Sequence, residues 1–118
     1  VLGKSASAHA RERLLASLAG LRKAAYLKTL ETSVREDRGA PVERIAVPTL
    51  VVTGDEDAVY PLATAEAMAR RIPGARLAVI AGAGHVSNLE RPEAFNATVL
   101  GFLREHRDRA SPPRQSPG

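Results

Sequence analysis

The sequence comprises 118 residues, of which 44% are hydrophobic and 25% are charged, as expected for one small globular domain. Aromatic residues make up only 3% and tryptophan is absent, so the aromatic platforms that stack on single-stranded nucleic acid are not expected. The sequence contains no cysteine, which excludes a disulfide framework, a cysteine-based zinc site and a thiol nucleophile within it.

The charge pattern argues against a nucleic-acid or membrane-surface partner. The net charge is +4, but arginines alternate with acids in residues 35–38 and 104–109, which is typical of a solvated face. The longest apolar run, residues 45–52, is too short to cross a bilayer, and no signal peptide opens the sequence. A cytoplasmic location is the default expectation. Because the first residue is Val rather than Met, we expect the natural start to lie upstream.

Two helices are predicted in the first 40 residues. Apolar side chains recur at helical spacing over residues 6–20 and again over residues 27–34. Glycine and proline in residues 37–41 end the second helix, and a short connector over residues 42–45 follows.

The remainder alternates between strands and helices. Residues 49–53 are so uniformly apolar that they predict a parallel strand covered on both faces, and residues 76–80 predict a second strand. Pro61 and Pro92 each open a helix, and the tail from Ala110 has nothing to bury and is expected to be disordered. The apolar faces of these helices are predicted to comprise Leu62, Ala65, Ala69 and Ile72 in the first, and Phe95, Val99, Phe102 and Leu103 in the second.

This order predicts an α/β fold with two parallel strands joined by a right-handed helical crossover and covered by one more helix. A parallel pair on its own leaves open edges and too small a core, so further strands are required. We expect them to lie N-terminal to this sequence, supplied either by a longer chain or by another chain.

Two residues that could carry chemistry follow the predicted strands. Asp57 comes after the first strand and His85 after the second, so both are expected at the carboxyl edge of the sheet, where open α/β sheets bind ligands. A carboxylate that accepts a hydrogen bond from imidazole Nδ1–H fixes the tautomer and leaves Nε2 free to take a proton from a nucleophile. The pair therefore predicts general-base chemistry.

The surrounding residues carry a resemblance to a known family. Residues 47–61, in which a strand after Val-Pro runs into Gly-x-x-Asp and a proline four residues later, resemble the acid loop of the α/β-hydrolases. Residues 81–85 and 88–96 are similar to the histidine loop and final helix of that family, and residues 26–45 resemble the end of its helical cap. The family places its catalytic residues in the order Ser, Asp, His, and the matching acid and base are Asp57 and His85.

The resemblance implies three parts: residues 1–40 as the end of a helical cap, residues 41–108 as the C-terminal part of the mostly parallel, doubly wound hydrolase core, and residues 109–118 as a disordered tail. It implies a serine-dependent hydrolase that needs no metal or organic cofactor. Members act on esters, lactones or related carbonyl compounds, on some carbon–carbon bonds of diketone-like substrates, and in cofactor-free halide oxidation. The resemblance does not choose among these substrates.

The nucleophile of such a site is not found in this sequence. A Gly-x-Ser-x-Gly turn should precede the cap, but residues 3–7 have Ser where the second Gly belongs and no strand before them. The missing N-terminal half of the same fold would have to supply the serine and the oxyanion hole, and the 118 residues alone are expected to be inactive. The alternative is a nucleophile-less hydrolase relative that acts as a binding or interaction module.

Other polar residues are expected to have supporting roles. Asp55 is the fallback acid if the loop is shifted in register, and Glu56 is expected to face solvent in the turn. His9 and His106 lie among charges and are expected at the surface. Three glycines are expected to permit the tight backbone after each strand, and two valines could line the pocket or the core. These residues are Gly54, Gly82 and Gly84, and Val59 and Val86.

Overall fold

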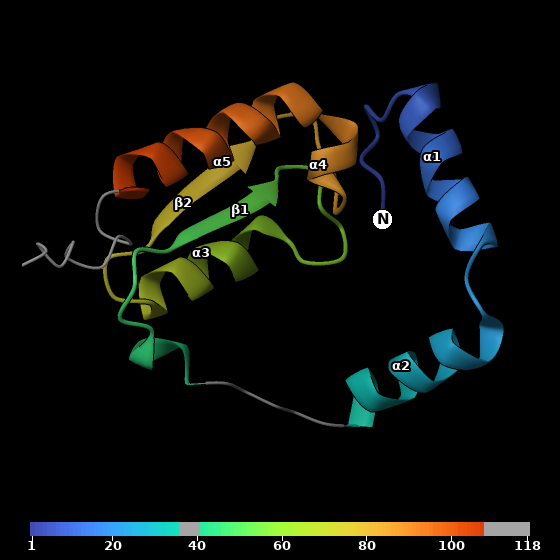
Figure 1. Ribbon diagram of the computed structural model, residues 1–118, viewed down its shortest axis with the longest axis horizontal. Coiled ribbons are helices and arrows are strands. Elements are labelled where there is room, and N and C mark those ends of the chain that lie inside the picture. The colour runs from blue at the N-terminus through green and yellow to red at the C-terminus, as the bar shows by residue number, and fades with distance from the viewer. Residues whose placement is uncertain (36–40, 108–118) are drawn as a thin grey trace, which may run out of the picture.

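The computed structural model describes residues 1–35 and 41–107 and has helices on both sides of a small parallel sheet (Figure 1). Among these residues, no helix is long and apolar enough to cross a membrane. In chain order the elements are α1 (Ala8–Ala19), α2 (Lys23–Arg35), the 3-10 helix η1 (Val42–Arg44), β1 (Leu50–Gly54), α3 (Leu62–Arg71), β2 (Arg76–Ile80), α4 (Ser87–Glu90) and α5 (Pro92–His106).

The sheet consists of β1 and β2, which pair in parallel with Leu50 opposite Arg76 and Gly54 opposite Ile80. Helix α3 connects the two strands and covers one face of the sheet, while α5 lies across the other face (Figure 1). The predicted α/β arrangement is therefore confirmed, and β2 has the predicted bounds. Because both strands run in one direction, their carboxyl ends lie at the same edge of the sheet.

The hydrophobic core is small because the sheet has only two strands within the described residues. The buried hydrophobic side chains are few, and Leu50, Val51 and Val52 of β1 are only half-buried although helices cover both faces of the sheet. The expectation that helices cover both faces of this strand is confirmed. Its apolar side chains, however, are less buried than expected. The buried hydrophobic residues are Ala10, Ile72, Ile80 and Ala83.

Helices α1 and α2 form where the apolar periodicity predicted them and lie apart from the sheet (Figure 1). The Ser7 hydroxyl caps α1 by accepting a hydrogen bond from the Ala10 N–H at 3.1 Å, and Gly20 ends this helix. Their apolar side chains remain largely exposed, which indicates a surface without its packing partner. These side chains are Leu15 and Leu18 of α1 and Leu27 and Leu30 of α2, and Leu21 between the two helices is exposed as well.

Some local predictions differ from the structure or lie outside it. The single-turn helix α4 and the 3-10 helix η1 were not expected, and Leu103 of α5 is 55% exposed rather than on the buried face. The predicted stop of the second helix at 37–41 falls mostly on residues outside the described ranges, and so does the tail at 109–118.

Replacing Gly54 with alanine tests the close approach of the two loops that follow the strands. A Cβ at Gly54 would collide with the backbone carbonyl of Ala83, so we expect Gly54→Ala to lower the free energy of unfolding by about 3 kcal/mol. The control is Gly101→Ala in the middle of α5, where a Cβ meets nothing within 4 Å and should stabilise the helix by about 1 kcal/mol. Urea unfolding of both variants checks the difference, and equal effects would contradict it.

Candidate active site

Two loops at the carboxyl edge of the sheet are joined by hydrogen bonds. The acid loop (residues 55–61) follows β1 and the histidine loop (residues 81–86) follows β2. The Glu56 N–H donates to the Ala83 carbonyl at 2.9 Å, and the Asp55 carboxylate accepts from the Gly82 N–H at 2.7 Å. These hydrogen bonds hold the two loops side by side, and the predicted meeting of their side chains follows from this pairing.

Glycine is required at three positions of these loops. Gly82 has a φ of 66°, in the left-handed region that favours glycine. A Cβ at Gly54 would collide with Ala83, and a Cβ at Gly84 would collide with the backbone of residues 1–3. The expectation that these glycines permit a tight backbone is confirmed.

His85 and Asp57 lie in direct contact. The distance from His85 Nδ1 to Asp57 Oδ2 is 3.0 Å, which is a hydrogen bond in the tautomer that carries its proton on Nδ1. The Asp57 side chain is 7% exposed and the His85 side chain 38% exposed. Nε2 has no hydrogen-bond partner among the described residues, so the arrangement holds a buried carboxylate behind an accessible imidazole.

Backbone groups complete the hydrogen bonding of the Asp57 carboxylate. Oδ1 accepts the N–H groups of Val59 at 2.8 Å and Tyr60 at 2.9 Å, while Oδ2 faces His85. Desolvation raises the pKa of Asp57, but the hydrogen bonds from His85, Tyr60 and Val59 together outweigh it and lower the pKa below its ordinary value. The carboxylate is therefore ionised at neutral pH and suited to stabilising an imidazolium.

A cavity of about 270 Å³ lies beside the pair. Four consecutive residues of β1, Val51–Gly54, line it, and because successive side chains of a strand point to opposite faces, this places the cavity along the unpaired edge of the strand. The Tyr60 ring lies near His85, with 5.5 Å between ring centroids. Val59 and Val86 do not line the cavity. The remaining lining residues are Asp57, Tyr60, Thr64, Ala65, Met68, His85 and Ser87.

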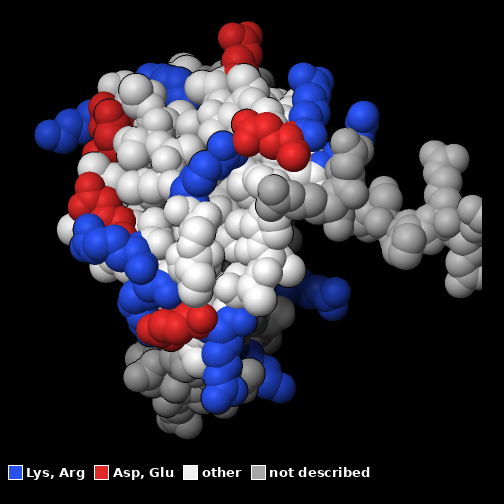
Figure 2. Space-filling model, turned by 90° about the vertical axis from the view of Figure 1, so that its left-hand side faces the viewer, with Lys and Arg blue, Asp and Glu red and all other residues white. Residues whose placement is uncertain are grey.

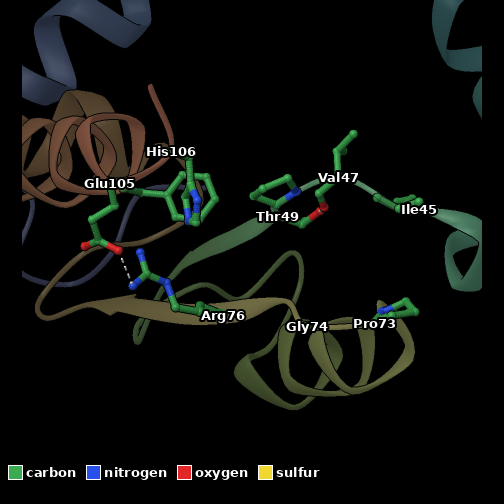
Figure 3. Close-up of a pocket in the computed structure, with 11 residues that line it drawn as sticks. Ile45, Val47, Thr49, Pro73, Gly74, Arg76, Glu105 and His106 are labelled. Atoms are coloured by element: carbon green, nitrogen blue, oxygen red, sulfur yellow. Dashed lines mark hydrogen bonds and ion pairs between the residues drawn. The ribbon is translucent and has the colours of Figure 1, made fainter. Parts of the chain in front are cut away.

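A second cavity of about 400 Å³ lies at the opposite, amino edge of the strands (Figure 3). Its charged groups are already paired, since Arg76 donates to Glu105 at 2.8 Å and stacks over Phe102 at 5.0 Å. His106 was expected at the surface, but it packs against Phe102 and its buried Nδ1 lacks a hydrogen-bond partner within the described residues. On this side of the molecule, acidic and basic side chains are interspersed (Figure 2).

The other candidate residues have structural contacts. Asp55, the fallback acid, ties the two loops together and does not contact His85. Glu56, expected to face solvent, accepts hydrogen bonds from the N–H and hydroxyl of Ser5. The sequence did not single out Glu90, which is buried at 4% exposure and contacts the backbone at Gly3, 87 residues away. Glu90 lies within residues 88–96, which carry the family resemblance, but its burial could not be predicted because it depends on a segment distant in sequence.

Comparison with known proteins agrees with this fold. A sequence profile of the alpha/beta hydrolase family matches residues 3–98, which is most of the chain. The chain therefore belongs to the alpha/beta hydrolase family, as the acid loop and histidine loop had indicated.

The relatives are longer proteins. Polyketide synthase ThaQ of Burkholderia thailandensis is 47% identical over 76 residues, which are 64% of this chain and 4% of that protein. 3-Oxoadipate enol-lactonase 2 of Acinetobacter baylyi is 33% identical over 93 residues, 79% of this chain and 34% of that protein. The structure of a thermophilic esterase from Thermogutta terrifontis is 40% identical with a TM-score of 0.53, over 53% of this chain and 23% of the esterase. The chain thus spans about a third or less of each relative.

Replacing Asp57 with asparagine tests the state of this carboxylate. Because the folded pKa is lowered, ionised Asp57 stabilises the fold above its unfolded pKa of about 3.9, and this stabilisation is lost as the pH falls through the folded pKa. We therefore expect the free energy of unfolding at pH 7 to be higher for the wild-type chain than for Asp57→Asn. This difference in stability should disappear below about pH 4. Urea unfolding at both pH values checks this, and a gap that does not change with pH would contradict it.

Proposed function

We propose that this chain supplies the acid and the base of a serine-dependent hydrolase, with Asp57 and His85 as the catalytic pair. The observation that carries the proposal is the 3.0 Å contact between His85 Nδ1 and the buried Asp57 carboxylate, which leaves Nε2 accessible. Membership of the alpha/beta hydrolase family supports it.

The serine nucleophile is proposed to come from sequence outside these 118 residues. Within the chain, the Ser5 hydroxyl donates to Glu56 at 2.7 Å and the Ser7 hydroxyl caps α1, so both have structural partners. Ser87 is buried and begins α4 rather than standing on a strand-to-helix turn. The unpaired edge of β1 beside His85 is the place where the missing part of the sheet would pair and bring such a turn into reach.

The proposed reaction follows from the orientation of the imidazole. As the serine oxygen attacks the substrate carbonyl carbon, its proton moves to His85 Nε2, and Asp57 stabilises the imidazolium through Nδ1. The same proton then passes to the leaving alcohol as the carbon–oxygen bond of the ester breaks, which yields an acyl-enzyme. Water then attacks the acyl carbon as its proton moves to Nε2; the bond to the serine oxygen breaks, Nε2 returns the proton to that oxygen, and the acid is released.

The proposed substrates are small esters, lactones or related carbonyl compounds. Similarity to an enol-lactonase and to an esterase supports this class. The exposed leucines of α1 and α2 fit helices of a cap, which closes over the substrate site in this proposal.

A second candidate is a nucleophile-less binding module. The absence of a Gly-x-Ser-x-Gly turn from the 118 residues favours it if these residues form a whole protein. In that case the unpaired edge of β1 and the exposed leucines of the first two helices would bind a partner. A Gly-x-Ser-x-Gly turn in sequence upstream of these residues would favour the hydrolase over the binding module.

Ester hydrolysis tests the proposal in a chain extended upstream to include the serine turn. We expect the extended chain to hydrolyse a nitrophenyl ester and the 118-residue chain to be inactive. His85→Ala should abolish turnover, because it removes the imidazole that accepts the serine proton. Asp57→Asn should lower kcat by about 10⁴-fold, as the corresponding change does in serine proteases.

Asp55→Asn is the matched control, because Asp55 does not contact His85 and the asparagine keeps an Oδ1 that can accept from the Gly82 N–H that joins the two loops. It should leave most of the activity in place. Near-normal turnover of His85→Ala, or loss in Asp55→Asn without loss in Asp57→Asn, would overturn the assignment of the pair.

A further inference from the structure

A buried carboxylate that the proposed reaction does not use lies beneath the histidine loop. Glu90, the last residue of α4, is 4% exposed. Its Oε1 accepts a hydrogen bond from the Gly3 N–H at 2.8 Å and its Oε2 one from the Gly84 N–H at 3.0 Å. One side chain therefore joins the segment before α1 to the residue that directly precedes His85.

The two backbones that Glu90 joins are in close contact. The His85 N–H donates to the Val1 carbonyl at 2.7 Å, and a Cβ at Gly84 would collide with the backbone of residues 1–3. The backbone on the N-terminal side of the His85 Cα is thus held by contacts with this segment, and Glu90 holds the Gly84 N–H within it.

We propose that Glu90 is a positioning residue, which holds the histidine loop so that His85 Nδ1 stays aligned with Asp57. The inference rests on the proposed function of His85 as the base. Glu90 does not line the cavity beside His85, so it acts through the loop and not on a substrate. A carboxylate suits this role, because its two oxygens accept both N–H groups at once, whereas an amide offers only one acceptor.

A second carboxylate provides a matched comparison. Glu56 holds the same N-terminal segment through the N–H and hydroxyl of Ser5, but its side chain makes no hydrogen bond with the histidine loop. If Glu90 acted only by anchoring residues 1–5, loss of the Glu56 carboxylate would have a similar effect on turnover. If it acts by aligning His85, the two variants should differ.

The test compares Glu90→Gln, Glu90→Ala and Glu56→Gln in the extended, serine-containing chain. We expect Glu90→Ala to lower kcat by about 10²-fold, the size of effect that a misplacement of about 1 Å produces, with little change in KM. Glu90→Gln retains one acceptor and should fall between Glu90→Ala and wild type, while Glu56→Gln should stay within a few-fold of wild type. The proton NMR signal of the His85 Nδ1–H bound to Asp57 should weaken in the Glu90 variants alone.

Several outcomes would overturn the positioning role. Folded Glu90→Gln with the wild-type kcat and an unchanged Nδ1–H signal is one, and an equal loss of kcat in Glu56→Gln is another. If Glu90→Ala does not fold, Glu90→Gln decides the question by the same criteria. Failure of the proposed function is recognised separately, because His85→Ala would then remain active whatever the Glu90 variants do.

Discussion

The hydrogen bond between His85 Nδ1 and Asp57 Oδ2 is the interaction on which the proposed chemistry of this chain depends. It forms because two parallel strands end at one edge and because the loops after them are joined by backbone hydrogen bonds. Gly54 permits the approach, since any side chain there would collide with Ala83. The parallel sheet thus brings together two residues that lie 28 positions apart.

The same arrangement leaves one edge of each strand unpaired and several apolar side chains exposed within the described residues. β1 pairs on one side only within the described residues, and its apolar side chains are half-buried despite a helix on each face. Helices α1 and α2 expose leucines that a folded monomer would normally cover. The loops of the site are nevertheless well held, because their contacts are with each other and with residues 1–5 rather than with a large core.

Features with a local physical cause could be predicted from the sequence. Apolar runs and periodicity predicted the bounds of β2 and predicted β1, α1 and α5 to within a few residues of their observed bounds. The glycines after each strand indicated tight loops. The contact between Asp57 and His85 could be predicted because both follow parallel strands that end at one edge, and the family motifs around them supplied the proposed catalytic roles. What could not be predicted depends on contacts distant in sequence: the burial of Glu90 against Gly3, the partnering of Glu56 by Ser5, and the packing of His106 on Phe102.

Covalent labelling with a serine-reactive phosphonate, mapped by mass spectrometry, tests whether the nucleophile lies outside this chain and depends on His85. In the chain extended upstream, we expect one labelled serine outside the 118 residues, with labelling that is lost in His85→Ala. The 118-residue chain should remain unlabelled. Labelling of Ser5, Ser7 or Ser87, or labelling that persists without the His85 imidazole, would contradict the claim that this chain contributes the acid and base for a nucleophile that lies elsewhere.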